Sequence, residues 1–355
     1  MAETQERRPA SNWAPGSASR PPDPPQFLAR VILMLRRRRR TLRRLGVAAS
    51  FLIIAVSATI FVRTLLRIDV NKFKAAIAAT GGDQITLAFA FTALSYLALT
   101  GYDGLALRHL GIKVPYWLTA LASFASYAVS FTLGFPLVTG GAIRYWLYAP
   151  AGLTAGKVAS LTVVAGVTFW LGMGSIVGVG FMTASDAVAE INHFNPLANR
   201  LIGLSVLVAL IVYLVWVGSM RWRDSAIVGT FKLPGPLVTL GQMALGVADV
   251  CSASAALYFL LPKGSTIGFP TFATLYSLAA MLGIASHSPG GLGVFEVTIL
   301  QGVGGDSDAL LASLLLFRGI YYVAPFIGAM ALLGGVEATR RWRSIREAMT
   351  APSDE

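Results

Sequence analysis

Five ionisable residues lie within or beside strongly apolar segments of the chain, where charge is costly. A charged side chain at the centre of a bilayer costs roughly 2.5–3.5 kcal/mol on insertion scales and more in simulations. Three acids and two bases at that cost indicate ion pairs, a polar cavity within a bundle of helices, or both. The five residues are Asp103, Arg144, Asp249, Glu296 and Arg318.

Arg144 follows the glycine pair Gly140–Gly141 within one helical turn. A guanidinium can hold a phosphate through two parallel hydrogen bonds, and backbone amides at the start of a re-entrant helix would assist. The alternative is an interhelical salt bridge that only fixes packing. Arg144 is therefore a candidate anion-binding residue with a structural alternative.

The three acids are candidates for binding a cation, as Arg144 is for binding an anion. Glu296, Asp249 or Asp103 could attract a cationic group, and Arg318 could pair with Glu296 or with Asp249. Asp103 comes at the end of the apolar segment 85–105. Capping at the membrane interface is the simpler interpretation for that residue.

Two apolar stretches, 136–153 and 287–305, are interrupted by Gly and Pro. Each follows a Ser- and Ala-rich span and contains a Pro, a Gly-Gly pair and then a charge, and the Gly pairs stand 150 positions apart. This pattern is typical of an inverted repeat with discontinuous helices around a buried cavity. Chance is the alternative, because the chain contains 36 Gly. The candidate site residues are Arg144, Glu296, Asp249, Arg318, Gly140, Gly141, Pro289, Gly290 and Gly291.

Several chemistries find no support in the residues. Cys251 is the single cysteine, and His109, His193 and His287 are far apart, so no zinc-type spacing exists. The Gly pairs stand in apolar context rather than between a strand and a helix, as a nucleotide-binding loop requires. We expect no metal, no cofactor and no nucleophile–base pair.

The composition is that of a membrane protein. The chain is 55% hydrophobic and 13% charged, against about 25% charged in soluble domains. Several apolar runs reach the roughly 20 residues needed to cross a bilayer. We expect an all-α polytopic bundle of about eight full spans plus the two broken elements. The expected spans are 45–63, 85–105, 115–135, 156–182, 198–219, 236–260, 266–286 and 308–336.

The basic residues predict the orientation. Eleven of the 29 Lys and Arg residues lie within the first 44 positions, and four more follow the last apolar run. Basic clusters beside spans are retained in the cytoplasm, so we expect both termini inside and a bacterial-type inner membrane. The expected division is a disordered basic tail 1–44, a transmembrane domain 45–338 and a short tail 339–355. Nucleic acid is not an expected partner, because the Arg run adjoins a membrane span.

Two segments of the chain carry recognisable motifs. The segment 126–172 contains Gly-Phe-Pro, Gly-Gly-x-x-Arg-Tyr and Gly-Leu-x-x-x-Lys-Val-Ala-Ser-Leu, and 288–296 reads Ser-Pro-Gly-Gly-Leu-Gly-Val-Phe-Glu. Both motifs resemble those of a known family, the lysylphosphatidylglycerol synthase/flippase proteins. The resemblance spans 45–340. It implies a module that moves aminoacylated phosphatidylglycerol to the outer leaflet and protects against cationic antimicrobial peptides. By the motif match, Arg144 and Glu296 take places within the lipid pathway.

The same resemblance sets the expected partners. Full-length members carry a soluble synthase domain after the membrane region, whereas this chain ends about 20 residues after its last expected span. We therefore expect phospholipids as partners and lysyl transfer, if any, from a separately encoded synthase. A homo-oligomer is left open. The alternatives to a lipid transporter are a membrane subunit of a lipid-modifying enzyme and a non-catalytic scaffold.

Overall fold

The computed structural model describes residues 80–350, except 135, 223–226, 229–230, 233 and 287–288, together with residues 74 and 76–78. The predicted tail 1–44 and the first predicted span 45–63 lie outside this part, as do His287 and Ser288 of the second broken stretch.

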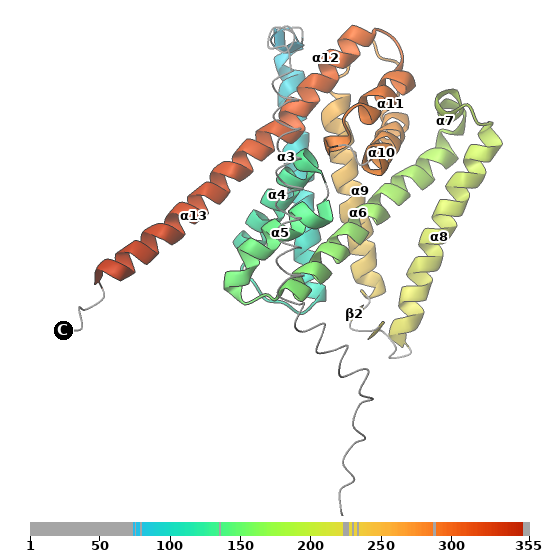
Figure 1. Ribbon diagram of the computed structural model, residues 1–355. Helices are drawn as coiled ribbons and strands as arrows, with labels where there is room; N and C mark the ends of the chain where they lie inside the picture. Colours follow the sequence, from blue (N-terminus) through green and yellow to red (C-terminus); the bar gives the residue numbers. More distant parts are fainter. Residues whose placement is uncertain are drawn as a thin grey trace, which may run out of the picture. The chain divides into compact units, whose positions relative to one another are not determined.

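The described residues are almost entirely helical (Figure 1). A small antiparallel pair of strands, β1 (Ile227–Val228) and β2 (Phe231–Lys232), lies between α8 and α9. The helices are, in chain order, α3 (Gly82–His109), α4 (Tyr116–Leu133), α5 (Pro136–Tyr148), η1 (Ala149–Ala151), α6 (Ala155–Thr183), α7 (Ser185–Asn192), α8 (Pro196–Trp222), α9 (Pro236–Tyr258), α10 (Phe269–Ala285), η2 (Pro289–Gly291), α11 (Val294–Val303), α12 (Ser307–Phe317), the π-helix η3 (Arg318–Val323) and α13 (Ala324–Thr350).

The predicted class, an all-α polytopic membrane bundle, is confirmed. In the described part, five helices are long and apolar enough to cross a membrane. Two further predicted spans, 115–135 and 266–286, form the shorter helices α4 and α10, of 18 and 17 residues. The five long helices are Gly82–His109, Ala155–Thr183, Pro196–Met220, Pro236–Tyr258 and Ser307–Trp342.

Helices α3 and α9 form an antiparallel pair. The Gln84 side chain near the start of α3 donates to the carbonyl of Phe259 just after α9, at 2.8 Å. Further along, Gly101 of α3 faces Leu245 of α9. The two helices therefore share a long interface, and α9 in turn runs beside α6, where Gln242 donates to Thr168 at 3.0 Å.

Small residues set how closely the helices approach. A Cβ added to Gly172 of α6 would lie 2.3 Å from the backbone of Gly246 on α9, so the two helices touch backbone to backbone. Gly178 faces Leu207 of α8, and Gly180 faces Thr274 of α10. The small residues between 172 and 180 therefore serve helix packing, as is common in membranes.

The first broken stretch forms a helical hairpin. Gly134 follows the last residue of α4 and has a φ of +81°, which glycine adopts without strain. α5 begins at Pro136, a residue suited to a first helical turn. Thr139 donates to the hydroxyl of Ser130 and to the carbonyl of Gly134, at 3.1 and 2.9 Å. α5 thus returns along α4.

The second broken stretch forms a matching hairpin. α10 ends at Ala285, and α11 packs back along it, with the Phe295 and Tyr276 rings 5.5 Å apart. Gly290 and Gly291 between them have φ of +61° and +67°, and Gly291 lies against Gly283 of α10. The chain reverses here because glycine tolerates these backbone angles.

The two hairpins enter the bundle from opposite ends, and their turns touch (Figure 1). α4 starts beside the C-terminal half of α3, where the hydroxyls of Tyr116 and Thr100 lie 2.7 Å apart. α10 starts at the other end, where Phe269 packs on Tyr258. A Cβ on Gly290 would lie 3.3 Å from the carbonyl of Phe131 near the end of α4. This arrangement agrees with the predicted inverted repeat.

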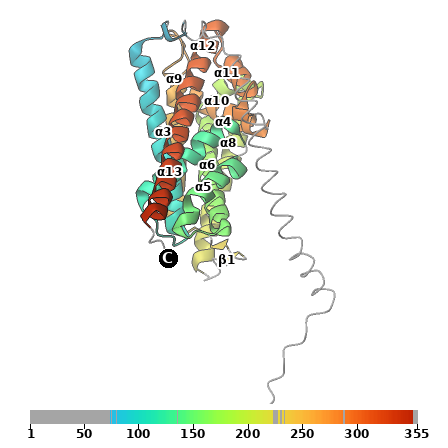
Figure 2. The ribbon, with the colours of Figure 1, turned by 60° about the vertical axis from the view of Figure 1, so that its left-hand side comes forward.

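α12, η3 and α13 form one long helical element that passes along α4 (Figure 2). Thr132 of α4 donates to the carbonyl of Tyr322 at 3.5 Å, and Gly328 packs on Phe124. The π-helix interrupts this element at Arg318–Val323. Single π-helical turns within α-helices are frequent at functional sites.

Candidate functional site

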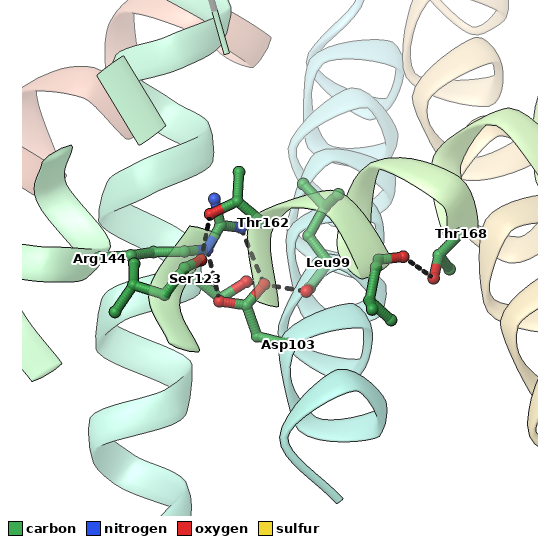
Figure 3. A network of polar contacts seen from close by, with 8 residues as sticks. Leu99, Asp103, Ser123, Arg144, Thr162 and Thr168 are labelled. Atoms are coloured by element: carbon green, nitrogen blue, oxygen red, sulfur yellow. Dashed lines mark hydrogen bonds and ion pairs between the residues drawn. The ribbon is translucent and has the colours of Figure 1, made fainter. Parts of the chain in front are cut away.

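Asp103 on α3 and Arg144 on α5 form a buried ion pair. The Arg144 Nε donates to Asp103 Oδ2 and its Nη2 to Oδ1, both at 2.8 Å. The side chains are only 3% and 0% exposed. Figure 3 shows Arg144 reaching from α5 to Asp103, beside the bond from the Ser123 hydroxyl to the Leu99 carbonyl. The pair ties the first hairpin to a full span.

The predicted glycine pair makes room for this arginine. A Cβ on Gly140 would lie 2.8 Å from the Ser130 hydroxyl and 3.1 Å from Arg144 Nη1, whereas Gly141 has Thr162 of α6 at 3.9 Å. The guanidinium stacks over the Tyr127 ring, with Cζ 4.7 Å from its centroid. Gly140 is therefore a packing requirement of the ion pair.

The structure corrects the interpretation of Asp103 as an interfacial cap. α3 continues to His109, four residues beyond the predicted end, so Asp103 lies inside the helix and is fully buried. Its carboxylate occupies two donors of Arg144. A phosphate could use these donors only after this pair opens.

A second ion pair joins the other hairpin to the long helix. Arg318 of η3 pairs with Glu296 of α11, which confirms one of the two predicted partners and leaves Asp249 apart. Arg318 Nη1 also donates to the Gly290 carbonyl at 3.0 Å, and its Cζ lies 5.1 Å from the Tyr322 ring centroid. The side chains of Arg318 and Glu296 are 16% and 18% exposed, so this pair is less enclosed than the first.

The turn 289–291 and the start of α11 form a cradle around this pair. The second oxygen of Glu296 accepts from the Gly293 amide at 2.8 Å. Pro289 opens the turn, and the positive φ of Gly290 lets its carbonyl reach Arg318. The motif residues of the second broken stretch therefore hold one guanidinium.

Asp249 lies in the middle of α9 without a charged partner among the described residues. Its Oδ1 accepts from the Ser95 hydroxyl at 2.5 Å and its Oδ2 from the Tyr102 hydroxyl at 2.8 Å. The Ser95 hydroxyl also lies 2.8 Å from that of Tyr321 in η3. Asp249 thus links α9 to α3 and η3.

Sequence reasoning missed Ser95 and Tyr102. Together with Leu99 and Asp103 they fall at the i, i+4, i+7 and i+8 positions of α3, which is one helical face. That spacing was a usable signal, because it groups polar side chains on an otherwise apolar helix. One face of α3 therefore serves both the Arg144 pair and Asp249.

An open groove runs between α5 and α13, on the outer side of the first hairpin. Its volume is about 370 Å³, and it is lined by Ala142, Ile143, Trp146, Leu333, Gly334 and Glu337. At one end the Arg340 guanidinium lies over the Trp146 ring, with Cζ 4.7 Å from its centroid. Within the described residues, no cluster of three His, Cys, Asp or Glu side chains could hold a metal ion.

The sequence matches the family "Lysylphosphatidylglycerol synthase TM region" over residues 45–329. The chain belongs to this family. The resemblance predicted from the Gly-Gly motifs is confirmed.

Three proteins are similar in sequence to this chain. An uncharacterized protein of Synechocystis sp. is 34% identical over 276 residues, which are 75% of this chain and 84% of that protein. Inner membrane protein YbhN of Escherichia coli is 27% identical over 241 residues, 67% of this chain and 75% of that protein. Phosphatidylglycerol lysyltransferase of Staphylococcus aureus is 27% identical over 212 residues, 51% of this chain and 25% of that enzyme.

Proposed function

We propose that this protein moves phospholipid between the leaflets of the inner membrane, with aminoacylated phosphatidylglycerol such as lysylphosphatidylglycerol as its substrate. The observation that carries the proposal is the pair of opposed helical hairpins whose turns touch, each tied to a full-length helix by one ion pair. Irregular backbone at such depth is tolerated where it is buried or lines a cavity, and inverted repeats of this kind surround transport sites.

The two ion pairs match the charges of such a lipid. An aminoacylated headgroup carries an anionic phosphate and at least one ammonium group. The phosphate would replace Asp103 on Arg144, and the ammonium group would replace Arg144 on Asp103, so no buried charge is left alone. Glu296 and Arg318 offer the same exchange at the other hairpin. Each pair therefore acts as a gate that the headgroup itself opens.

The groove between α5 and α13 supports a path for the acyl chains. Apolar residues of both helices line it, and it runs along the hairpin that carries Arg144. A headgroup could enter the bundle there while its chains stay in the membrane. Arg340 at the end of the groove could meet the phosphate first.

The orientation follows from the charges at the two ends of the bundle. Segments at the C-terminal end of α3 contain Arg108, Lys113, Lys157, Arg221, Lys232, Arg340, Arg341 and Arg346. Segments at the opposite end contain the acids Asp83, Asp186, Glu190, Asp306 and Asp308, against the basic residues Lys74, Arg200 and Lys263. The excess of basic residues supports a cytoplasmic position for the first end, and with it for the C-terminus. Transport would then export the lipid and reduce the negative surface charge that attracts cationic peptides.

The domain division belongs to the same proposal. Residues 45–338 form the lipid-moving unit, and 1–44 and 339–355 are cytoplasmic extensions. α13 continues without a break to Thr350, so the second boundary falls within a helix.

Lipid movement in vesicles tests the proposal. The purified full chain is reconstituted in vesicles containing headgroup-labelled lysylphosphatidylglycerol or phosphatidylglycerol, and transfer between leaflets is measured. We expect the double variant Asp103→Asn/Arg144→Gln to slow transfer by about 10- to 100-fold, because one charge-assisted hydrogen bond is worth about 1.5–3 kcal/mol.

The matched control is Asp186→Asn/Arg200→Gln, which removes an exposed pair separated by 3.7 Å. It should transfer lipid at the unaltered rate. Equal rates for both double variants, with both proteins folded, would contradict a lipid path through the Arg144 pair.

A second candidate function is a membrane subunit of a lipid-modifying synthase. The match to a quarter of the Staphylococcus aureus lysyltransferase favours it. Lipids extracted from cells that contain the chain with and without a separately encoded synthase would separate the two functions. A new lipid species that requires this chain, without any transfer in vesicles, would favour the subunit.

A further inference from the structure

Asp249 is the interior acid that the proposed lipid path leaves unused. It is 2% exposed and lies at the middle of α9, where α3 packs against it. The hydroxyls of Ser95 and Tyr102 that donate to it are both fully buried. A charged carboxylate in such a place requires either a cation or a means of becoming neutral.

No cation meets this requirement among the described residues. Both interior arginines are engaged elsewhere, Arg144 with Asp103 and Arg318 with Glu296. The titratable groups that interact with Asp249 come from α3, α4, α9, α10 and η3, and all are uncharged at neutral pH. They are Tyr96, Tyr102, Tyr127, Cys251, Tyr276 and Tyr321.

The hydrogen-bond geometry suits both forms of the carboxyl group. When ionised, Asp249 accepts from Ser95 and Tyr102. When protonated, it can donate to Ser95, because the Ser95 hydroxyl can turn and donate to Tyr321 Oη, 2.8 Å away. The proton is taken up from water and returned to water, with no other bond formed or broken.

The neighbours of Asp249 connect it to both hairpins. Ser95 lies on α3, the helix that carries Asp103, the partner of the first hairpin. Tyr321 lies in the same π-helix as Arg318, the partner of the second hairpin. A change in the Ser95–Tyr321 contact therefore acts on the helices that hold both gates.

We infer that Asp249 is a proton-binding site that couples lipid movement to the proton gradient across the membrane. Coupling rests on the proposed lipid transport, whereas proton binding by Asp249 does not. In the ionised form the Ser95 and Tyr102 hydroxyls donate to the carboxylate, and the Tyr321 hydroxyl donates to Ser95. In the protonated form the Ser95–Tyr321 bond reverses direction and the uncharged carboxyl group is the weaker acceptor, so α9 is held less tightly to α3.

Infrared spectroscopy tests proton binding without any lipid assay. Difference spectra of the purified protein between acidic and alkaline buffers should show the carbonyl band of a buried carboxylic acid. The band should disappear in Asp249→Asn and remain in the control Asp186→Asn, whose side chain is 79% exposed. Tyr102→Phe keeps the acid but removes one donor, so it should shift the frequency of the band. A spectrum without such a band, or a band unchanged in Asp249→Asn, overturns the inference.

Transport against a pH gradient tests coupling. In vesicles of phosphatidylcholine with labelled lysylphosphatidylglycerol, one pH unit acting on one proton per lipid should change the leaflet ratio by up to about tenfold. Asp249→Asn should exchange lipid without responding to the gradient. Transfer by the unaltered protein that ignores the gradient overturns coupling but leaves lipid transport standing. Absence of any transfer overturns both transport and coupling, and the infrared band then decides proton binding alone.

Discussion

At the scale of single residues, the five ionisable residues of the apolar segments form two ion pairs and one carboxylate that accepts hydrogen bonds from hydroxyls. Removing one member of a buried pair is more damaging than removing both, because the remaining charge stays buried without compensation. Asp103 and Arg144 are the clearest case, since both are almost completely enclosed. The contribution of this pair to the free energy of unfolding can therefore be measured apart from any effect on lipid transfer.

We predict that Asp103→Asn lowers the free energy of unfolding by about 3–5 kcal/mol, because Arg144 is left buried and unpaired. The double variant Asp103→Asn/Arg144→Gln should recover a large part of this loss. Thermal unfolding in detergent measures both. The exposed pair offers the control, since Arg200→Gln should change stability by at most about 1 kcal/mol. Equal losses in the single and double variants would show that the two residues do not act as a pair.

At the scale of the elements, glycine has two roles, one in the turns of the hairpins and one in the contacts between helices. In the turns of the hairpins it permits a positive φ, as at Gly134 and Gly290. In α6 it permits contact between helix backbones, as at Gly172 against Gly246. Membrane helices gain little from the hydrophobic effect when they associate, so close packing supplies much of their attraction.

We predict that Gly172→Ala destabilises the bundle by about 1–3 kcal/mol, because the added methyl group has no space between α6 and α9. Gly166 lies in the same helix and has no atom within 4 Å of an added Cβ. Gly166→Ala should therefore be neutral or stabilise by about 0.5–1 kcal/mol. Thermal unfolding of the two variants compares them directly, and a similar loss in both would show that α6 and α9 are not in backbone contact.

At the scale of the whole described bundle, the two hairpins and the distribution of charge agree on one arrangement. The hairpins enter from opposite ends, and each is tied to a long helical element by one ion pair. α8 presents much of its apolar surface outward, with 11% of an 18-residue apolar stretch buried, as expected of a helix in contact with lipid. The predicted orientation places the basic end in the cytoplasm.

Cysteine labelling measures this orientation. In a Cys251→Ala background, we predict that Lys263→Cys, between α9 and α10, reacts with a membrane-impermeant maleimide on intact spheroplasts. Lys113→Cys, between α3 and α4, should react only after lysis. The two substitutions are chemically identical and lie at opposite ends of the bundle. The reverse pattern would contradict the predicted orientation.

The sequence alone determined the class, the family and the places where helices break. Long apolar runs exclude a soluble fold. The Pro and Gly-Gly clusters mark helix breaks, because proline lacks a backbone N–H and glycine readily adopts a positive φ. The sequence also predicted that Arg144 and Glu296 occupy corresponding positions of a repeat. In the structure each forms an ion pair, Arg144 with Asp103 and Glu296 with Arg318.

Only the tertiary structure decided which residues meet. Asp103 and Arg144 are 41 residues apart, and Tyr102 and Asp249 are 147 apart. In a soluble protein, the apolar face of a helix indicates what it packs against. In a membrane protein, lipid and bundle interior are both apolar, so the periodicity of the sequence does not show which face is buried. Partners across helices are therefore fixed by packing and charge neutralisation, which appear only when the chain is folded.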